Sequence, residues 1–326
     1  MRADRSRFWC PTACCGRAGW GARIFTAPLW AGYTTDRVKI SEILIRTTAH
    51  LAQRFPDTAR VEAEWILSAL LDISRTEIYL RSGETFPADL VSRLEEIIIS
   101  RLQANPLQYL LGFTEFYGRR FACDARALIP RPETEILVLS TLAHLNATFP
   151  PRNGVHPPVW DIGTGSGNIA VTLACERRDL LVLATDTDAA ALQLARENAQ
   201  LCRVADRVIF AAGSLCDAVA PAPRFAAMCS NPPYVSECAR DTLPADVRDF
   251  EPPQALFAPE NGLCYLREII SRAADHLAHG GLLALEIGYD QSDAVRTLLF
   301  AHGAYDSIKL TKDLAGHLRV ASAVRI

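Results

Sequence analysis

The stretch from Val159 to Ala174 restricts the possible folds more than any other part of this chain. It begins with a short apolar run, Val159–Ile162, continues through five residues that include three glycines, and ends in apolar residues at helical spacing. Glycines permit positive φ angles and let the backbone approach a ligand closely, and the first turn of a helix offers free N–H groups. The order of strand, glycine turn and helix therefore predicts an α/β fold with a ligand at this turn.

The spacing of the glycines and the acid that follows them narrow the choice of ligand. The turn has the pattern G-x-G-x-G, which differs from the G-x-G-x-x-G of a dinucleotide pyrophosphate site. A second apolar run, Leu181–Thr185, predicts a strand that leads to Asp186, roughly 20 residues after the last glycine, where a ribose-binding acid belongs. Asp161 precedes the glycines, where an acid can also cap the helix or brace the loop.

A second motif follows the apolar run Phe225–Cys229, which predicts a buried strand, and consists of Asn231-Pro232-Pro233-Tyr234. The two prolines fix φ and remove backbone donors, so nearby carbonyls are free to accept hydrogen bonds from an NH₂ group. Tyr234 supplies a flat face for stacking. Such a corner can hold a planar amide or amine, although Asn-Pro also occurs in ordinary strand-ending turns.

A ribose-binding acid, a glycine turn without phosphate spacing and an amide-binding corner together indicate S-adenosylmethionine as the cofactor. Its sulfonium carries the methyl group, so the protein need only position the acceptor. The hypothesis is a methyl transfer to nitrogen, with Asn231 and Pro232 holding the acceptor amide and no residue acting as a nucleophile.

Composition excludes several other classes of protein. The 326 residues are 49% hydrophobic with a net charge of −3, which is enough chain for about two domains. No apolar run approaches the roughly 18 residues needed to cross a bilayer, so we expect a cytoplasmic protein with no membrane contact. The weakly acidic balance argues against a protein that binds nucleic acid directly through its phosphates.

The ten cysteines do not form a metal-binding pattern. Cys10, Cys14 and Cys15 lack a second pair or a nearby histidine, so we expect no metal site. The cysteines within apolar patterns are expected to be buried free thiols: Cys175, Cys202, Cys216, Cys229 and Cys264.

Three segments precede the predicted sheet. Residues 1–36 are rich in Arg, Gly and Trp and lack a helical period, so we expect a disordered extension or an overlong start rather than a transit peptide. Residues 37–112 predict a helical bundle that docks the substrate, with a capping box from Ser74 to Glu77 and Pro87 in a first helical turn. Residues 113–130 predict a hairpin linker.

Residues 131–326 alternate between strand and helix patterns and form the predicted catalytic domain. This alternation predicts a mostly parallel, Rossmann-like sheet that binds its ligand at the carboxyl ends of the strands. Before it, two prolines bracket Arg131 in a stiff segment that leads to a helix near Thr134. That segment either connects the domains or lines the cofactor pocket. The later expected elements are strands 208–211, 282–287, 307–310 and 318–324, and helices 263–277 and 290–300.

Several motifs make the chain similar to one family, the HemK/PrmC protein glutamine methyltransferases. The resemblance runs from about residue 40 to the C-terminus and rests, besides the two motifs above, on Pro106–Gly112, Ile129–Glu135, Phe250-Glu251-Pro252, and Lys312–Gly316 with Arg319. It implies a Rossmann-like S-adenosylmethionine-dependent methyltransferase with a small N-terminal helical domain. It further implies methylation of the glutamine in the Gly-Gly-Gln motif of peptide chain release factors, which would be its protein partners in translation termination.

The resemblance also implies roles for individual residues. The glycine turn would hold the methionine end of the cofactor, Asp186 the ribose, and the turn at Leu215 the adenine, although the family usually has an acid where Ser214 stands. The expected cofactor-binding residues are Gly163, Thr164, Gly165, Ser166, Gly167, Asp186, Leu215 and Asn231. The expected catalytic residues are Asn231, Pro232 and Tyr234, and the expected substrate-binding residues are Asn231, Pro232, Pro233 and Tyr234.

Three alternatives stay open at the level of sequence. A nucleic-acid adenine N6-methyltransferase uses the same corner for an exocyclic NH₂ group, but it would carry a basic recognition region that this chain lacks. A ribosomal-protein glutamine methyltransferase is the nearest enzyme alternative, and Asp249-Phe250-Glu251 favours the release-factor type. The third is a binding module that keeps the fold without activity.

Overall fold

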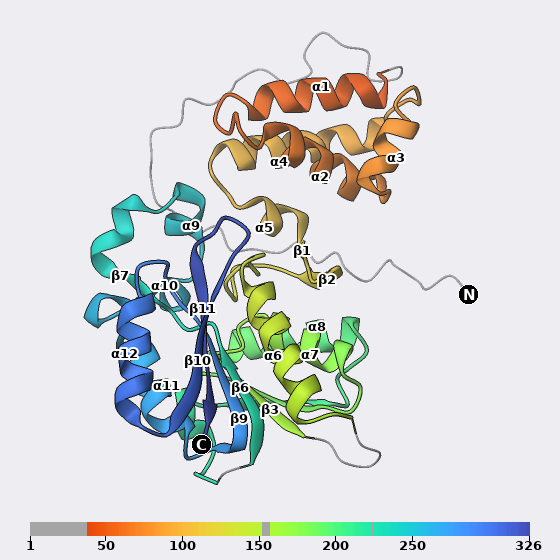
Figure 1. The fold of residues 1–326 in the computed structure, drawn as a ribbon. Helices are drawn as coiled ribbons and strands as arrows, with labels where there is room; N and C mark the ends of the chain where they lie inside the picture. Colours follow the sequence, from red (N-terminus) through yellow and green to blue (C-terminus); the bar gives the residue numbers. More distant parts are fainter. Residues whose placement is uncertain (1–37, 152–156, 223) are drawn as a thin grey trace.

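The computed structural model of the protein describes residues 38–151, 157–222 and 224–326. A helical part precedes a part built around a sheet, and a short helix and a hairpin connect the two (Figure 1). The predictions for residues 1–36, including the cysteines at 10, 14 and 15, lie outside the described residues. Within the described ranges, no helix is long and apolar enough to cross a membrane.

The helical part confirms the predicted apolar spacing. Its helices share one apolar core and are α1 (Ile40–Leu51), α2 (Ala59–Leu71), α3 (Arg75–Leu80), η2 (Ala88–Leu90) and α4 (Val91–Leu102). Ser74 and Glu77 form the predicted capping box at the start of α3, each side chain bonding to the backbone of the other residue. Pro87 lies directly before η2, not within the first turn of a helix.

The predicted hairpin is also present. Helix α5 (Leu107–Leu111) ends at Gly112, and β1 (Phe113–Phe116) pairs antiparallel with β2 (Arg119–Ala122). Tyr117 and Gly118 form the turn with φ angles of 51° and 68°. Positive φ at both central positions matches the right-handed twist of the two strands.

A seven-stranded sheet confirms the predicted fold class. Its strand order is β10-β11-β9-β6-β3-β4-β5. β11 points in the opposite direction to the six other strands, which all run parallel to one another. The order along the chain reverses between β3 and β6, where a ligand site is expected. The strands are β3 (Pro158–Ile162), β4 (Leu181–Asp186), β5 (Val208–Ala212), β6 (Phe225–Ser230), β9 (Leu277–Glu286), β10 (Tyr305–Lys312) and β11 (Leu318–Arg325).

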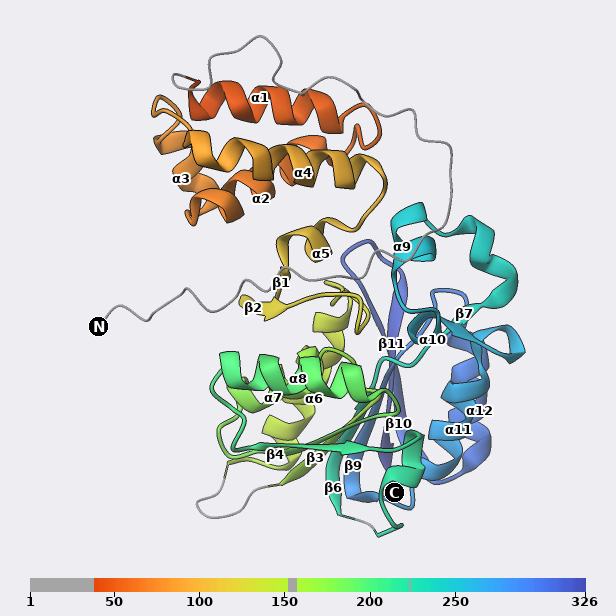
Figure 2. The same ribbon diagram turned by 180° about the vertical axis from the view of Figure 1, so that it is seen from behind.

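Helices cover both faces of this sheet, as the two opposite views show (Figures 1 and 2). The central strand β3 is apolar except for Asp161 because it faces a core on each side: Val159 packs into one core, and Trp160 and Ile162 pack into the other. One face carries α6 (Thr134–Thr148), α7 (Asn168–Glu176) and α8 (Ala189–Leu201), and the other carries α11 (Cys264–Ala273) and α12 (Ser292–His302).

One predicted helix boundary is wrong. The helix expected over residues 263–277 ends at Ala273, and Leu277 already begins β9. Leu277 continues the apolar spacing of the helix, which hides the change of element from pattern analysis. The register of β9 against β6 shifts after Phe225, where Gly280 adopts a φ angle of 75°. The irregular start of β9 therefore looks like a loop in the sequence.

The segment between β6 and α11 forms short elements, and one of them, α9, lies toward the helical part (Figure 1). Arg101 at the end of α4 donates two hydrogen bonds to Glu62 at 2.7 and 3.0 Å and one to Asp246 on α9 at 3.2 Å. This nearly buried arginine joins the two parts of the chain. The short elements are β7 (Val235–Ser236), η4 (Glu237–Thr242), α9 (Ala245–Phe250), α10 (Pro253–Leu256), β8 (Phe257–Ala258) and η5 (Glu260–Gly262).

We expect Arg101→Met to destabilise the protein by about 3 to 5 kcal/mol, because it leaves the buried Glu62 carboxylate without its partner. Adding Glu62→Met should restore most of this loss. Arg81→Met, which removes an exposed ion pair with Glu84, should change the free energy of unfolding far less. Urea unfolding followed by circular dichroism measures all four proteins. Equal losses for the two arginine variants would contradict the buried role of Arg101.

Candidate active site

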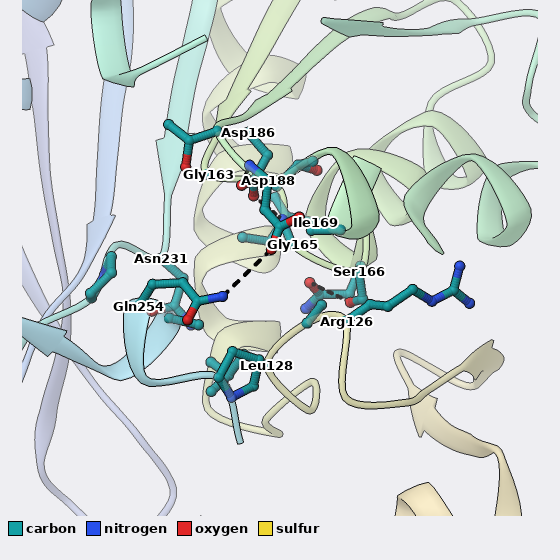
Figure 3. Close-up of a pocket in the computed structure, with 18 of the residues that line it drawn as sticks. Arg126, Leu128, Gly163, Gly165, Ser166, Ile169, Asp186, Asp188, Asn231 and Gln254 are labelled. Carbon is teal, nitrogen blue, oxygen red and sulfur yellow. Dashed lines mark hydrogen bonds between the residues drawn. The ribbon is translucent and has the colours of Figure 1, made fainter. Parts of the chain in front are cut away.

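Three chain segments leave the sheet together at the reversal of strand order. Ile162, the last residue of β3, is in register with Thr185 on β4 and with Ser230 on β6. The residues that follow Ile162 and Ser230 are Gly163 and Asn231, so the two motifs lie side by side. The structure thus brings together the glycine turn, Asp186 and Asn231 around one pocket (Figure 3).

Most of the predicted site residues line this pocket, and three do not. Pro232 is buried beneath the corner, Tyr234 lies outside the lining, and Gly167 faces α8. The predicted residues in the lining are Gly163, Thr164, Gly165, Ser166, Asp186, Leu215, Asn231 and Pro233.

Asp161 braces the glycine turn from below. One of its carboxylate oxygens accepts hydrogen bonds from the Thr164 hydroxyl at 2.6 Å and from the Ala170 backbone N–H at 3.1 Å. The other oxygen, Oδ1, is buried and accepts no hydrogen bond from the described residues. Burial raises the pKa of Asp161 to about 7, which outweighs the two hydrogen bonds. Asp161 therefore fills both expected roles: it braces the loop through Thr164 and caps α7 through the Ala170 N–H.

The glycines of the turn serve two different purposes. A Cβ at Gly163 would meet no atom within 4 Å, so the backbone is open on that side, whereas a Cβ at Gly167 would lie 3.0 Å from the Cβ of Ala195 on α8. Both positions have positive φ, at 68° and 80°. Gly163 therefore leaves room for a ligand, and Gly167 allows α8 to pack closely against the start of α7.

Asp186 connects the second strand to the glycine turn. Its carboxylate accepts a hydrogen bond from the Gly165 N–H and another from the Asp188 N–H, both at 2.9 Å. The carboxylate lines the pocket and retains acceptor capacity for further donors. Across the pocket, Gln254 on α10 donates to Asp188 at 3.5 Å, as the dashed line in Figure 3 shows.

The Asn231 side chain is held through its nitrogen. Nδ2 donates to the Thr134 hydroxyl at 3.2 Å, and that hydroxyl donates to Glu286 at 2.6 Å. Within the described residues, no donor bonds to Asn231 Oδ1. The Tyr234 hydroxyl also donates to Glu286, at 3.2 Å, which turns this side chain toward the network instead of the pocket.

The segment with two prolines lines the pocket, which settles its role. Ile129, Pro130 and Arg131 all contribute to the lining. Glu251, which is buried, accepts hydrogen bonds from the Ile129 N–H at 3.1 Å and from the Arg131 guanidinium. The Phe-Glu-Pro motif therefore fixes the loop that covers the site.

Several lining residues escaped prediction. Pro252 belongs to the Phe-Glu-Pro motif and could have been inferred, but Gln254 and Tyr265 carry no chemical pattern in the sequence. The adenine-side turn is formed as expected, since Ser214 and Leu215 both line the pocket and Leu215 has a φ angle of 44°. Five of the cysteines were expected to be buried; Cys216 and Cys229 are, and Cys175, Cys202 and Cys264 are half-buried.

The strand order, the glycine turn at the reversal point and the Asn-Pro-Pro-Tyr corner beside it define a Rossmann-like methyltransferase. Residues 42–112 match the family described as PrmC N-terminal domain, and residues 141–245 match the family described as Methyltransferase small domain. Several relatives that carry the same name align with nearly all of the described residues.

A release factor glutamine methyltransferase of Neisseria gonorrhoeae is 42% identical over 262 residues, which is 80% of this chain and 92% of that protein. The enzyme of the same name from Koribacter versatilis is 37% identical over 83% of this chain and 93% of its own length. That from Rhodopirellula baltica is 33% identical over 87% and 95%. The chain belongs to the family of release factor glutamine methyltransferases.

The buried Glu286 predicts a measurable dependence of stability on pH. Burial raises the pKa of Glu286 from 4.5 to about 7. The folded protein therefore holds a proton that the unfolded chain releases, and this contribution to stability is lost as pH rises from about 4.5 to 7. Relative to Glu286→Gln, the wild-type protein should lose roughly 2 to 3 kcal/mol between pH 5 and pH 8.

Urea unfolding of both proteins at the two pH values measures this difference, and the comparison cancels the titration of all other groups. A difference that stays constant with pH would show that Glu286 ionises as readily in the folded protein as in the unfolded chain.

Proposed function

We propose that this protein transfers a methyl group from S-adenosylmethionine to the side-chain nitrogen of the glutamine in the Gly-Gly-Gln motif of peptide chain release factors. Membership in the family supports the substrate. The observation that carries the chemistry is the position of Asn231, whose Oδ1 has no donor among the described residues and which lies beside the glycine turn.

The donor set of the pocket fits the proposed cofactor. The open side of Gly163 gives room for the methionine end, and the Asp186 carboxylate can accept hydrogen bonds from two ribose hydroxyls. Leu215 offers an apolar surface for the adenine ring. When bound, S-adenosylmethionine supplies a methyl group activated by a positively charged sulfur. The protein's task is to present the acceptor nitrogen to that group.

A glutamine amide nitrogen is a weak nucleophile because its lone pair is delocalised into the carbonyl group. In this proposal Asn231 Oδ1 and the Pro232 carbonyl accept one N–H each, and neither accepts a hydrogen bond from the described residues. Pro232 lies outside the pocket lining, so its carbonyl would act from the edge of the site. Two such bonds fix the plane of the amide and direct the face of its nitrogen. Alignment of this kind supplies roughly 7 to 11 kcal/mol in favourable intramolecular reactions.

The same two oxygens favour the positive charge that develops on nitrogen during transfer. Fixed dipoles cost no reorganisation at the moment of reaction. The methylated nitrogen is acidic and releases its proton afterwards, so we assign no general base. Tyr234 contributes through the position of the corner, since its hydroxyl bonds to Glu286 outside the pocket lining.

The helical part is the proposed docking site for the release factor. Residues 42–112 match a domain that is specific in its description to this family, and Arg101 fixes the position of that part relative to α9. A substrate from translation also places the protein in the cytoplasm.

Asn231→Ala should lower kcat for a purified release factor by about 10²- to 10³-fold, because one of the two oxygens that orient the amide is lost. Binding of S-adenosylmethionine, measured by calorimetry, should change little. Transfer of a labelled methyl group is the assay, with a release factor whose Gly-Gly-Gln glutamine is replaced by asparagine as the negative control. Labelling of DNA or RNA by the wild-type protein would favour a nucleic-acid methyltransferase instead.

Asp186→Ala should weaken S-adenosylmethionine binding by about 10- to 100-fold, since it removes hydrogen bonds to a charged acceptor. Asp186→Asn keeps nearly the same shape and one acceptor oxygen. Its dissociation constant for S-adenosylmethionine should lie between those of the wild type and Asp186→Ala. Calorimetry on the three proteins tests the placement of the ribose. An unchanged dissociation constant in Asp186→Ala would exclude that placement.

A further inference from the structure

A carboxylate lies in the core behind the corner and is not part of the pocket lining. Glu286, the last residue of β9, is 1% exposed and takes part in no ion pair of the described residues. Its two oxygens accept hydrogen bonds from two hydroxyl groups, Thr134 at 2.6 Å and Tyr234 at 3.2 Å. An apolar residue of this size would fill the same space without the cost of desolvating a carboxylate. The acceptor oxygens are therefore what distinguishes Glu286 from a packing residue.

The chemistry of these groups fixes the direction of every hydrogen bond between Glu286 and Asn231. Above its pKa of about 7, Glu286 is ionised and only accepts, so the single hydroxyl hydrogen of Thr134 must point at Glu286. The remaining lone pairs of the hydroxyl can only accept, and the nearest group is Asn231 Nδ2 at 3.2 Å. The amide nitrogen of Asn231 is thereby committed to Thr134. Its oxygen must then face the opposite way.

We propose that Glu286 and Thr134 are positioning residues that hold Asn231 with its oxygen directed at the substrate amide. A hydroxyl without a carboxylate behind it could donate to Asn231 Oδ1 as readily as it accepts from Nδ2, and the amide would then populate both orientations. Only one of them offers an oxygen to the acceptor NH₂ group. This inference rests on the proposed function of Asn231.

The same carboxylate also holds the far end of the corner. Tyr234 is three residues after Asn231, and its hydroxyl bonds to the second oxygen of Glu286. The two prolines between them limit the backbone to a narrow range of conformations. Glu286 therefore connects both ends of the motif to the end of β9, which is the strand next to β6 in the sheet.

Thr134→Val tests the inference, because valine has nearly the same shape and removes only the hydroxyl group. We expect kcat for the release factor to fall by about 10²-fold, the effect of a small displacement of a positioned group. The dissociation constant for S-adenosylmethionine and the KM for the release factor should stay within about twofold of wild type. Thr134→Ser, which keeps the hydroxyl, should recover most of kcat.

Thr141→Val is the matched control. Thr141 is a buried threonine further along the same helix, and its hydroxyl donates to the Leu137 carbonyl at 2.8 Å without contacting Asn231. Thr141→Val also removes one hydroxyl group from a buried threonine of this helix, so it should leave kcat unchanged. Thermal unfolding of both variants separates a loss of stability from a loss of positioning.

A double-mutant cycle with Asn231→Ala shows whether Thr134 acts through Asn231. In single-turnover assays, Thr134→Val should have no further effect once Asn231 is alanine, whereas independent roles would give additive losses. Additive losses, or an unchanged kcat in folded Thr134→Val, would overturn the inference. The proposed function fails separately, by the absence of methyl transfer from the wild-type protein to a release factor.

Discussion

The register of β3 against its two neighbours is the constraint on which the site depends. Ile162 is paired with both Thr185 and Ser230, so the segments that follow three different strands start at one level of the sheet edge. The buried Ser230 hydroxyl donates to the Ile162 carbonyl at 2.7 Å and fixes this level where the two motifs begin. A slip of one residue would turn Asp161 to the other face and leave the glycine turn without its brace.

A second set of contacts connects the helical part to the pocket. Arg101 bonds to Asp246 on α9, and Glu251, which directly follows that six-residue helix, holds Ile129 and Arg131 in the pocket lining. The proposed docking surface on the helices is therefore connected to an element that continues into the wall of the pocket. In the proposed function orientation is the main contribution of the protein, so a rigid connection between that surface and the pocket would have a direct catalytic value.

The fold and most of the residues expected around the pocket could be predicted because they depend on local chemistry. A glycine turn between strand and helix, and an Asn-Pro-Pro-Tyr corner after a strand, are visible within a few residues of sequence. The proposed role of Glu286 could not be predicted, because its partner Thr134 is 152 residues away and Glu286 directly follows an apolar run, Leu282–Leu285. The directions of Gly167, Pro232 and Tyr234 were also beyond prediction, since spacing fixes a turn but not which of its members face the ligand.

Asp161 and Glu286 have the same structural role near the ends of two strands, which is to orient a threonine hydroxyl group. Each is a buried carboxylate that accepts from a threonine hydroxyl, Thr164 in the turn and Thr134 at the start of α6, and each has a pKa raised to about 7 by burial. Such groups cost stability, because burial disfavours their charge and neither forms an ion pair with a described residue. In return, each determines which way a hydroxyl donates. Protonation would remove that certainty, since a carboxyl group can donate as well as accept. The fidelity of the site therefore depends on keeping two carboxylates ionised in an environment that resists their charge.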